Sequence, residues 1–294
     1  MGAHFDTERA TIESRLDDIC TTYLAGLPAP IRDAVQYGLK SPGKRLRPLL
    51  LLFAYRAAGG TSDATMLACA PELIHAYSLV HDDLPCMDDD DMRRGRPTLH
   101  KVYGSRTAIL AGVTMIPLAA RVVRDSARAM RLADSTAAKL LETLLGASGA
   151  GGMIGGQLRD LSAEGLALSL DELEAIHSAK TGAIIVAAVR MGALAAGSDA
   201  AGITALERYG RSIGLAFQIM DDVLDVTSTT KALGKTTGRD ALLGKSTYPA
   251  LLGVDGARSR AQALIDDGLR SLAEHGLMTQ ELSQVANFMV TRTS

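Results

Sequence analysis

The chain has 294 residues, a formal net charge of -2 at pH 7, and 47% hydrophobic residues. A charge this close to zero argues against a general nucleic-acid-binding protein. Aromatic residues make up only 4% of the chain and tryptophan is absent. This composition favours packed helices over sheets, so we expect an all-α fold.

Nothing in the sequence divides the chain into parts. We find no linker, low-complexity tract or repeat, so one domain over residues 1–294 is predicted. The first 20 residues are polar and acidic, and no apolar run approaches the ~20 residues of a membrane span. The three cysteines are scattered and odd in number, which suits a reducing compartment. Together these features predict a cytoplasmic protein.

The first predicted elements are a helix over residues 7–24 and a basic turn over residues 41–48. The turn reads Ser-Pro-Gly-Lys-Arg-Leu-Arg-Pro and precedes an apolar run. Lys44 and Arg47 are three residues apart and can converge on one anion at a helix start. A solvated surface turn would explain the same residues, so both interpretations stay open at this point.

A dense acidic cluster follows a predicted core helix over residues 66–84. Its aspartates are Asp82, Asp83, Asp88, Asp89, Asp90 and Asp91, and the arginines behind them are Arg93, Arg94 and Arg96. Like charge packed against a core segment is unfavourable unless a cation binds there. Mg2+ is the natural counter-ion, and the arginines indicate that phosphate oxygens complete its ligands. A solvated loop broken by Pro85 is the alternative.

The middle of the chain continues as helix over residues 101–123. The glycine-rich residues 146–157 lack dinucleotide-binding spacing, because position 154 is Ile, and are typical of helices that approach closely. Another helix opens at Asp171 and Glu172 and reaches Lys180 and Thr181. A Lys-Thr pair in a helix is ordinarily a surface feature.

A second acidic cluster lies about 140 residues after the first. Gln218, Asp221, Asp222 and Asp225 follow the spacing i, i+3, i+4, i+7, so they share one helix face. Two carboxylate clusters, both flanked by core-like sequence, predict two walls of one cavity. A later Gly-Lys-Ser-Thr run is not a P-loop, because Arg239 stands where the motif requires glycine.

These motifs resemble one enzyme family. The pattern Asp-Asp-(four residues)-Asp before Arg-Arg-Gly-x-Pro-Thr, with a later Phe-Gln-x-x-Asp-Asp-x-x-Asp, is similar to the short-chain trans-polyprenyl diphosphate synthases, above all the bacterial farnesyl diphosphate synthase type. The resemblance runs from about residue 42 to the C-terminus. It implies a large isoprenoid-synthase helical bundle around a central cavity, and a homodimer.

The activity implied by this resemblance is the Mg2+-dependent head-to-tail condensation of isopentenyl diphosphate with dimethylallyl or geranyl diphosphate, giving farnesyl diphosphate. About three Mg2+ ions would be held by Asp82, Asp88 and Asp221. Isopentenyl diphosphate would be bound by Lys44, Arg47, His75 and Arg94. The allylic diphosphate would be held by Arg93, Lys180 and Lys235, and the Thr181 hydroxyl would face its reacting carbon. Gln218 is a further substrate-binding residue. The floor that limits product length would be formed by Tyr77 and Ser78.

Several alternatives remain at this stage. The same chemistry could stop at ten or twenty carbons. A terpene cyclase would usually carry one Asp-rich motif and lack the Lys44 and Arg47 site, and a non-catalytic partner subunit would have lost one motif. The chain also departs from the family at Val113, where Asp is common. Spacing alone favours a core role for His75, whereas the resemblance makes it a ligand of isopentenyl diphosphate. Arg292 is expected near the isopentenyl site.

Overall fold

The computed structural model describes residues 5–227 and 245–292. Within these ranges the expected all-α fold is confirmed. The helices are α1 (Asp6–Tyr23), α2 (Ala29–Leu39), α3 (Leu46–Ala57), α4 (Thr65–Asp82), α5 (Leu99–Tyr103), α6 (Ser105–Ala129), α7 (Asp134–Ser148), α8 (Met153–Ser162), α9 (Leu170–His177), the π-helical turn η2 (Ser178–Gly182), α10 (Ala183–Ala196), α11 (Ala200–Thr227), α14 (Tyr248–Glu274) and α15 (Gln280–Thr291). The strands β1 (Met92–Arg93) and β2 (Arg96–Pro97) pair as a short antiparallel hairpin.

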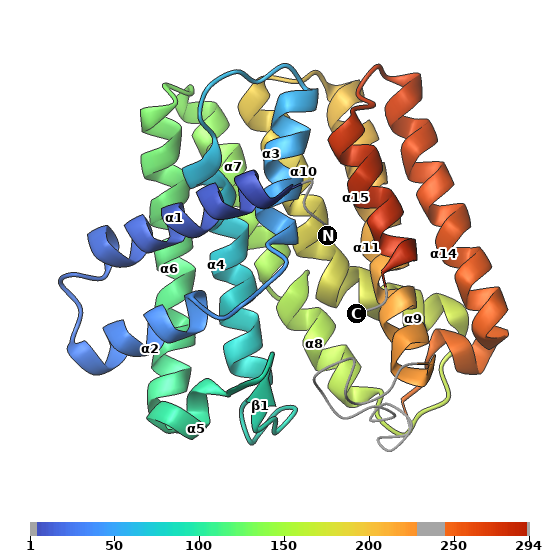
Figure 1. Ribbon diagram of the computed structural model, residues 1–294, viewed down its shortest axis with the longest axis horizontal. Helices are drawn as coiled ribbons and strands as arrows, with labels where there is room; N and C mark the ends of the chain where they lie inside the picture. The colour runs from blue at the N-terminus through green and yellow to red at the C-terminus, as the bar shows by residue number, and fades with distance from the viewer. Residues whose placement is uncertain (1–4, 228–244, 293–294) are drawn as a thin grey trace.

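One hydrophobic core runs through the molecule, from Phe5 beside α1 to Met289 in α15. Helix α3 packs against α4 and α10, and α10 packs in turn against α7 and α11. Helices α6 and α14 cover α4 and α11 on opposite sides of the molecule (Figure 1). Helix α10 carries Ala, Ile and Val around its circumference and is buried along most of its length, which suits its central place.

The two helices that carry the aspartate motifs end in the same region. Helix α4 ends at Asp82 and α11 ends at Thr227. Figure 1 shows both C-terminal ends at the end of the molecule where the β hairpin lies. The fold therefore brings two acidic segments, distant in sequence, to one end of the bundle.

Local sequence explains where the helices begin and end. Helix α1 buries Ile12, Leu16 and Ile19 on one face, as the predicted helix over residues 7–24 requires. Helix α9 begins with a capping box in which Ser169 and Glu172 bond each other's backbone amides. The predicted helix over residues 101–123 is wrong in one respect. Gly104, with φ 79°, separates α5 from α6, because this left-handed conformation favours glycine.

Two helical stretches are longer and more apolar than the sequence analysis expected. Ser105–Ala129 and Leu170–Ala196 could cross a membrane by length and composition alone, and each contains an 18-residue window with a mean hydropathy of 1.4. Of these windows, 44% and 61% is buried inside the molecule, and core helices of soluble proteins pass the same test. The expectation that no apolar run approaches the length of a membrane span is therefore wrong, and both stretches belong to the packing of helices within the fold.

Candidate active site

Arg45 organises the basic turn between α2 and α3, a role that the sequence analysis missed. Its backbone is left-handed, with φ 50°, and the residue is 4% exposed. Its guanidinium donates to both carboxylate oxygens of Glu13, at 2.6 and 3.1 Å, and to Glu72 at 2.9 Å. Two further bonds reach backbone carbonyl oxygens nearby. These bonds fix the turn that carries Lys44 and Arg47.

Positive charge gathers around this turn. The Nε of Arg47 is buried and has no hydrogen-bond partner among the described residues, and burial lowers the pKa of Arg47 to about 10. Burial and the guanidinium groups of Arg47 and Arg94 hold the pKa of His75 well below 6.5. Burial and Arg292 lower the pKa of Lys44. An anion bound here would offset the repulsion between these basic groups.

The β hairpin brings two of the predicted arginines to the site. Arg93 donates to Asp83 at 2.5 Å and to Asp90 at 3.0 Å. Arg94 donates to the carbonyl oxygen of Pro42 at 2.7 Å, and so reaches the basic turn from the hairpin. Arg93 is thus bonded to carboxylates here, whereas Arg94 stands beside the other predicted anion ligands.

The first aspartate motif crowds carboxylates together at the buried end of α4. The backbone amide of Asp88 donates to the carbonyl oxygen of Asp82 at 2.8 Å, which folds the motif back on itself. Burial, helped by Asp88, raises the pKa of Asp82 to about 7 against the opposing charges of Lys180 and Arg93. Burial also raises the pKa of Asp83 to about 6, despite its bond with Arg93. A divalent cation with oxygen ligands would relieve the repulsion between these carboxylates.

Two lysines meet on one carboxylate beside this motif. Lys180 lies in η2, and π-helical turns recur at functional sites. Its Nζ donates to an oxygen of Asp160 at 2.6 Å, and the Nζ of Lys245 donates to the same oxygen at 3.2 Å. A Cβ at Gly156 would lie 2.3 Å from the backbone nitrogen of Lys180, so glycine lets α8 touch η2. Sequence reasoning missed Lys245, because its partner lies 85 residues earlier.

A chain of hydrogen bonds joins η2 to α11 and α14. The hydroxyl of Thr181 donates to Oε1 of Gln218 at 3.2 Å, and Nε2 of Gln218 donates to Asp222 at 3.4 Å. Asp222 also accepts the backbone amide of Tyr248, the first residue of α14, at 3.1 Å. Asp222 therefore anchors the start of α14 to the helix that carries the second motif.

The carboxylates of the second motif differ in exposure. Asp222 and Asp225 are buried, whereas Asp221 is partly exposed. Asp221 forms an ion pair with Arg292 at 2.9 Å. Arg292 also donates to the carbonyl oxygen of Phe217 at 2.6 Å and lies 4.0 Å from the centre of its ring. Of the predicted metal ligands, Asp82 and Asp88 meet at the end of α4, while Asp221 lies beside the basic groups.

The predicted chain-length residues lie on α4. Tyr77 is 7% exposed, and its ring meets the ring of His81 edge-on, with 4.8 Å between centroids. Burial and the charge of Asp82 raise the pKa of Tyr77, so this ring lies close to the first aspartate. Ser78 donates to the carbonyl oxygen of His75 at 2.9 Å. The remaining predicted site residue, Lys235, lies outside the described residues.

Comparison with known proteins agrees with this geometry. Residues 28–283 match the model of the polyprenyl synthetase family. The chain is 48% identical over 278 residues to the farnesyl diphosphate synthase of Escherichia coli K12, covering 92% of this chain and 93% of that protein.

Solved structures show the same likeness. The crystal structure of a farnesyl-diphosphate synthase, described as putative, from Marinomonas sp. MED121 matches with a TM-score of 0.80 and 38% identity, over 96% of this chain and 97% of that one. The geranyltransferase of Helicobacter pylori, solved with magnesium and isoprenyl diphosphate, matches with a TM-score of 0.81 and 30% identity, over 99% and 97%. By its sequence, its fold and the arrangement of its two acidic motifs, this chain belongs to the polyprenyl synthetase family.

Proposed function

We propose that this protein is a prenyltransferase that condenses isopentenyl diphosphate with dimethylallyl or geranyl diphosphate and releases farnesyl diphosphate. One observation carries the proposal. His75 and the hairpin residues Arg93 and Arg94 line one pocket together with Asp83 of the first aspartate motif, to which Arg93 donates at 2.5 Å. A site with clustered basic groups on one side and clustered carboxylates on the other suits a diphosphate on the first side and a metal-bound diphosphate on the second.

Metal binding fits the residues present. Asp82 and Asp88 crowd negative charge at the end of α4, and Asp221 offers a further carboxylate from α11. We propose that these three residues hold Mg2+, about three ions as the family resemblance implies. Bound Mg2+ would neutralise the charge that develops on the diphosphate as the allylic C–O bond breaks.

Two lysines are positioned to bind the allylic diphosphate. Lys180 and Lys245 now share an oxygen of Asp160, and although burial opposes ionisation, both lysines lower the pKa of that carboxyl. A diphosphate placed beside them would accept the same ammonium groups. The Thr181 hydroxyl, held by Gln218, would face the cationic carbon. We assign Lys235 to the same diphosphate by resemblance.

Isopentenyl diphosphate would lie on the opposite side. Lys44, Arg47 and Arg94 would bind its diphosphate, and His75 would remain neutral and donate a hydrogen bond. Holding the double bond against the allylic cation is a proximity effect, and the apolar helices would exclude water. No side chain is an obvious general base, so the departing diphosphate would take the proton lost after the new C–C bond forms.

Product length is set, in this proposal, by Tyr77 with Ser78. Replacing Tyr77 by alanine removes a buried ring from the predicted floor, so we expect the main product to lengthen from fifteen to twenty carbons or more. Chromatography of the dephosphorylated products measures this. A Tyr77→Phe variant keeps the ring and should retain the fifteen-carbon product. Unchanged length in Tyr77→Ala would contradict this role for Tyr77.

We also propose that the chain acts as a single-domain, cytoplasmic homodimer. Helix α6 exposes Ile109, Leu110 and Val113 at 43%, 46% and 50%, on a helix only partly buried in this chain. A second copy of the chain would cover this apolar face. Val113 stands where the family commonly has Asp and adds to the apolar face. Analytical ultracentrifugation tests the assembly, and a single-chain mass at micromolar concentration would contradict it.

The decisive experiment combines purified protein with labelled isopentenyl diphosphate and each allylic diphosphate, with and without Mg2+. We expect a Mg2+-dependent fifteen-carbon product. A ten- or twenty-carbon product would keep the chemistry and change the product assignment. Consumption of an allylic diphosphate without isopentenyl diphosphate would favour a terpene cyclase instead. Absence of turnover with every substrate would favour a non-catalytic partner subunit.

A further inference from the structure

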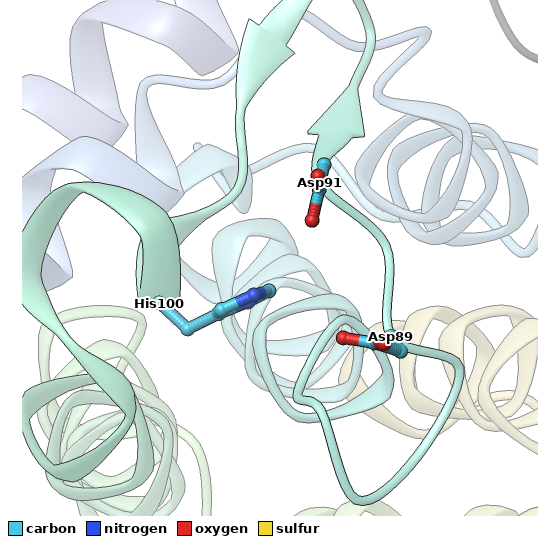
Figure 2. A group of neighbouring side chains, drawn as sticks. All are labelled: Asp89, Asp91 and His100. Carbon is cyan, nitrogen blue, oxygen red and sulfur yellow. The ribbon is translucent and has the colours of Figure 1, made fainter.

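A second group of possible metal ligands lies beside the β hairpin. Asp89 and Asp91 stand on the loop before β1, and His100 stands on α5. Figure 2 shows the His100 ring pointing toward the space between the two carboxylates. One ligand atom from each residue lies within 4.8 Å of the others. None of the three belongs to the ligands proposed for Mg2+.

The burial and the hydrogen bonding of His100 indicate a bound cation independently of the two carboxylates. The residue is 7% exposed, and its Nε2 is buried without a hydrogen-bond partner among the described residues. The other ring nitrogen, Nδ1, lies 3.2 Å from the hydroxyl of Thr98, which fixes the orientation of the ring. Metal-binding histidines are held through their second nitrogen in this way. A buried polar atom left unpaired is costly, so an occupant at Nε2 is expected.

Lys101 does not supply that occupant. Its Nζ pairs with Asp91 at 2.6 Å, and both residues are exposed. This pair neutralises one carboxylate at the surface and leaves Nε2 of His100 unsatisfied. Lys101 would instead compete with a bound cation for Asp91.

We propose that Asp89, Asp91 and His100 bind one Zn2+ ion, separate from the Mg2+ of the substrate site. Carboxylates alone would suit Mg2+, but an imidazole nitrogen favours a borderline cation such as Zn2+. The exposed side of the site leaves room for water as a further ligand. The ion ties the loop before β1 to α5, and so supports the hairpin that carries Arg93 and Arg94.

The test uses the untagged, metal-free full chain in an Asp82→Asn/Asp221→Asn background, which weakens metal binding at the substrate site. Titration calorimetry with Zn2+ and the visible absorption of bound Co2+ report the new site without any activity. We expect one Zn2+ per chain, with affinity at least tenfold weaker in His100→Asn and in Asp89→Asn. His100 is buried, so weaker binding in His100→Asn alone does not separate a lost ligand from a folding defect. Asp89 is exposed, so weaker binding in Asp89→Asn reports the lost ligand.

Two further variants sharpen the test. Lys101→Met removes the competing ammonium and should tighten Zn2+ binding several-fold. His275→Asn changes an exposed histidine elsewhere and should leave the titration unchanged. Failure of Zn2+ to bind even in Lys101→Met, or equal binding in Asp89→Asn and the background protein, would overturn the proposal. The titration measures Zn2+ binding in a background that lacks two proposed Mg2+ ligands. Its result is therefore independent of whether the protein catalyses the proposed condensation.

Discussion

At the scale of single residues, the Arg45 ion cluster makes the clearest prediction. Arg45→Met would leave Glu72, which is 3% exposed, buried without its ion partner. Breaking a buried pair from one side costs about 3–5 kcal/mol of unfolding free energy, measured by urea titration. Arg56→Met is the matched control, because its pair with Glu8 is more exposed and is worth under about 1 kcal/mol. Equal losses of unfolding free energy in Arg45→Met and Arg56→Met would contradict the stabilising role of the Arg45 ion cluster.

Sequence reasoning reached some residues of the site and missed others for a physical reason. Lys44 and Arg47 stand in one short motif, so their spacing and the resemblance singled them out. Arg45 stands in the same motif, but its importance rests on Glu13 and Glu72, which lie 32 and 27 residues away. Pairings of that kind depend on how helices pack, which spacing along one segment does not contain.

At the scale of helices, the contact between α8 and η2 can be tested through Gly156. A Cβ there would meet the backbone of Lys180, which cannot move aside as a side chain can. We expect Gly156→Ala to lower the unfolding free energy by about 1–3 kcal/mol and to raise KM for the allylic diphosphate as Lys180 shifts.

The glycine-rich stretch offers its own control for that variant. A Cβ at Gly146 in α7 would meet nothing within 4 Å. Gly146→Ala should therefore leave KM unchanged and stabilise the protein by up to about 1 kcal/mol, since alanine favours helix. If Gly156→Ala keeps the unfolding free energy and the KM of Gly146→Ala, the result contradicts the close approach of α8 to η2.

The end of α9 carries a pH-dependent contribution to stability. Burial, with Lys180 and Lys245 nearby, lowers the pKa of His177 to about 4, and its ring lies 5.5 Å from that of Tyr248. A base with a lower pKa in the folded state binds fewer protons there, so stability falls as the pH drops from about 6.5 to about 4.

Substituting His177 with phenylalanine should flatten this dependence. A pKa shift of one unit corresponds to about 1.4 kcal/mol, so the full loss of unfolding free energy between pH 6.5 and 4 is a few kcal/mol. This is an upper limit, because His177 is only partly buried. Thermal unfolding midpoints between pH 4.5 and 7.5 measure it. His275→Gln, at an exposed site, should keep the slope of the parent protein. A slope that survives in His177→Phe would show that another group causes it.

Helical elements were more predictable than their junctions. The helix over residues 7–24 follows from an apolar face repeated every three to four residues, and the structure places α1 at Asp6–Tyr23. The break at Gly104 and the π-helical turn at Lys180 were not foreseen. Both depend on backbone conformation at one point, which residue periodicity averages out.

At the scale of the whole molecule, we propose that one site binds two diphosphates, one on each of two sides. Lys44 stands on the side of Arg292 and Asp221, and Lys180 on the side of Asp160 and Lys245. Helices α3, α4, α10 and α11 hold the two sides together through shared packing. The aspartate motifs predicted two walls of a cavity, and the family resemblance implied which basic residues bind which diphosphate. The fold adds Asp160 and Lys245 beside Lys180.

The most direct measurement is therefore the KM for each substrate in Lys44→Met and Lys180→Met. Losing one charged hydrogen bond costs about 1.5–3 kcal/mol, or roughly ten- to a hundred-fold in binding. We predict that Lys44→Met raises KM for isopentenyl diphosphate and Lys180→Met raises KM for geranyl diphosphate, each with little effect on the other substrate. Lys139→Met, an exposed control, should change neither. Reversed effects, or equal effects on both substrates, would contradict the two-sided site.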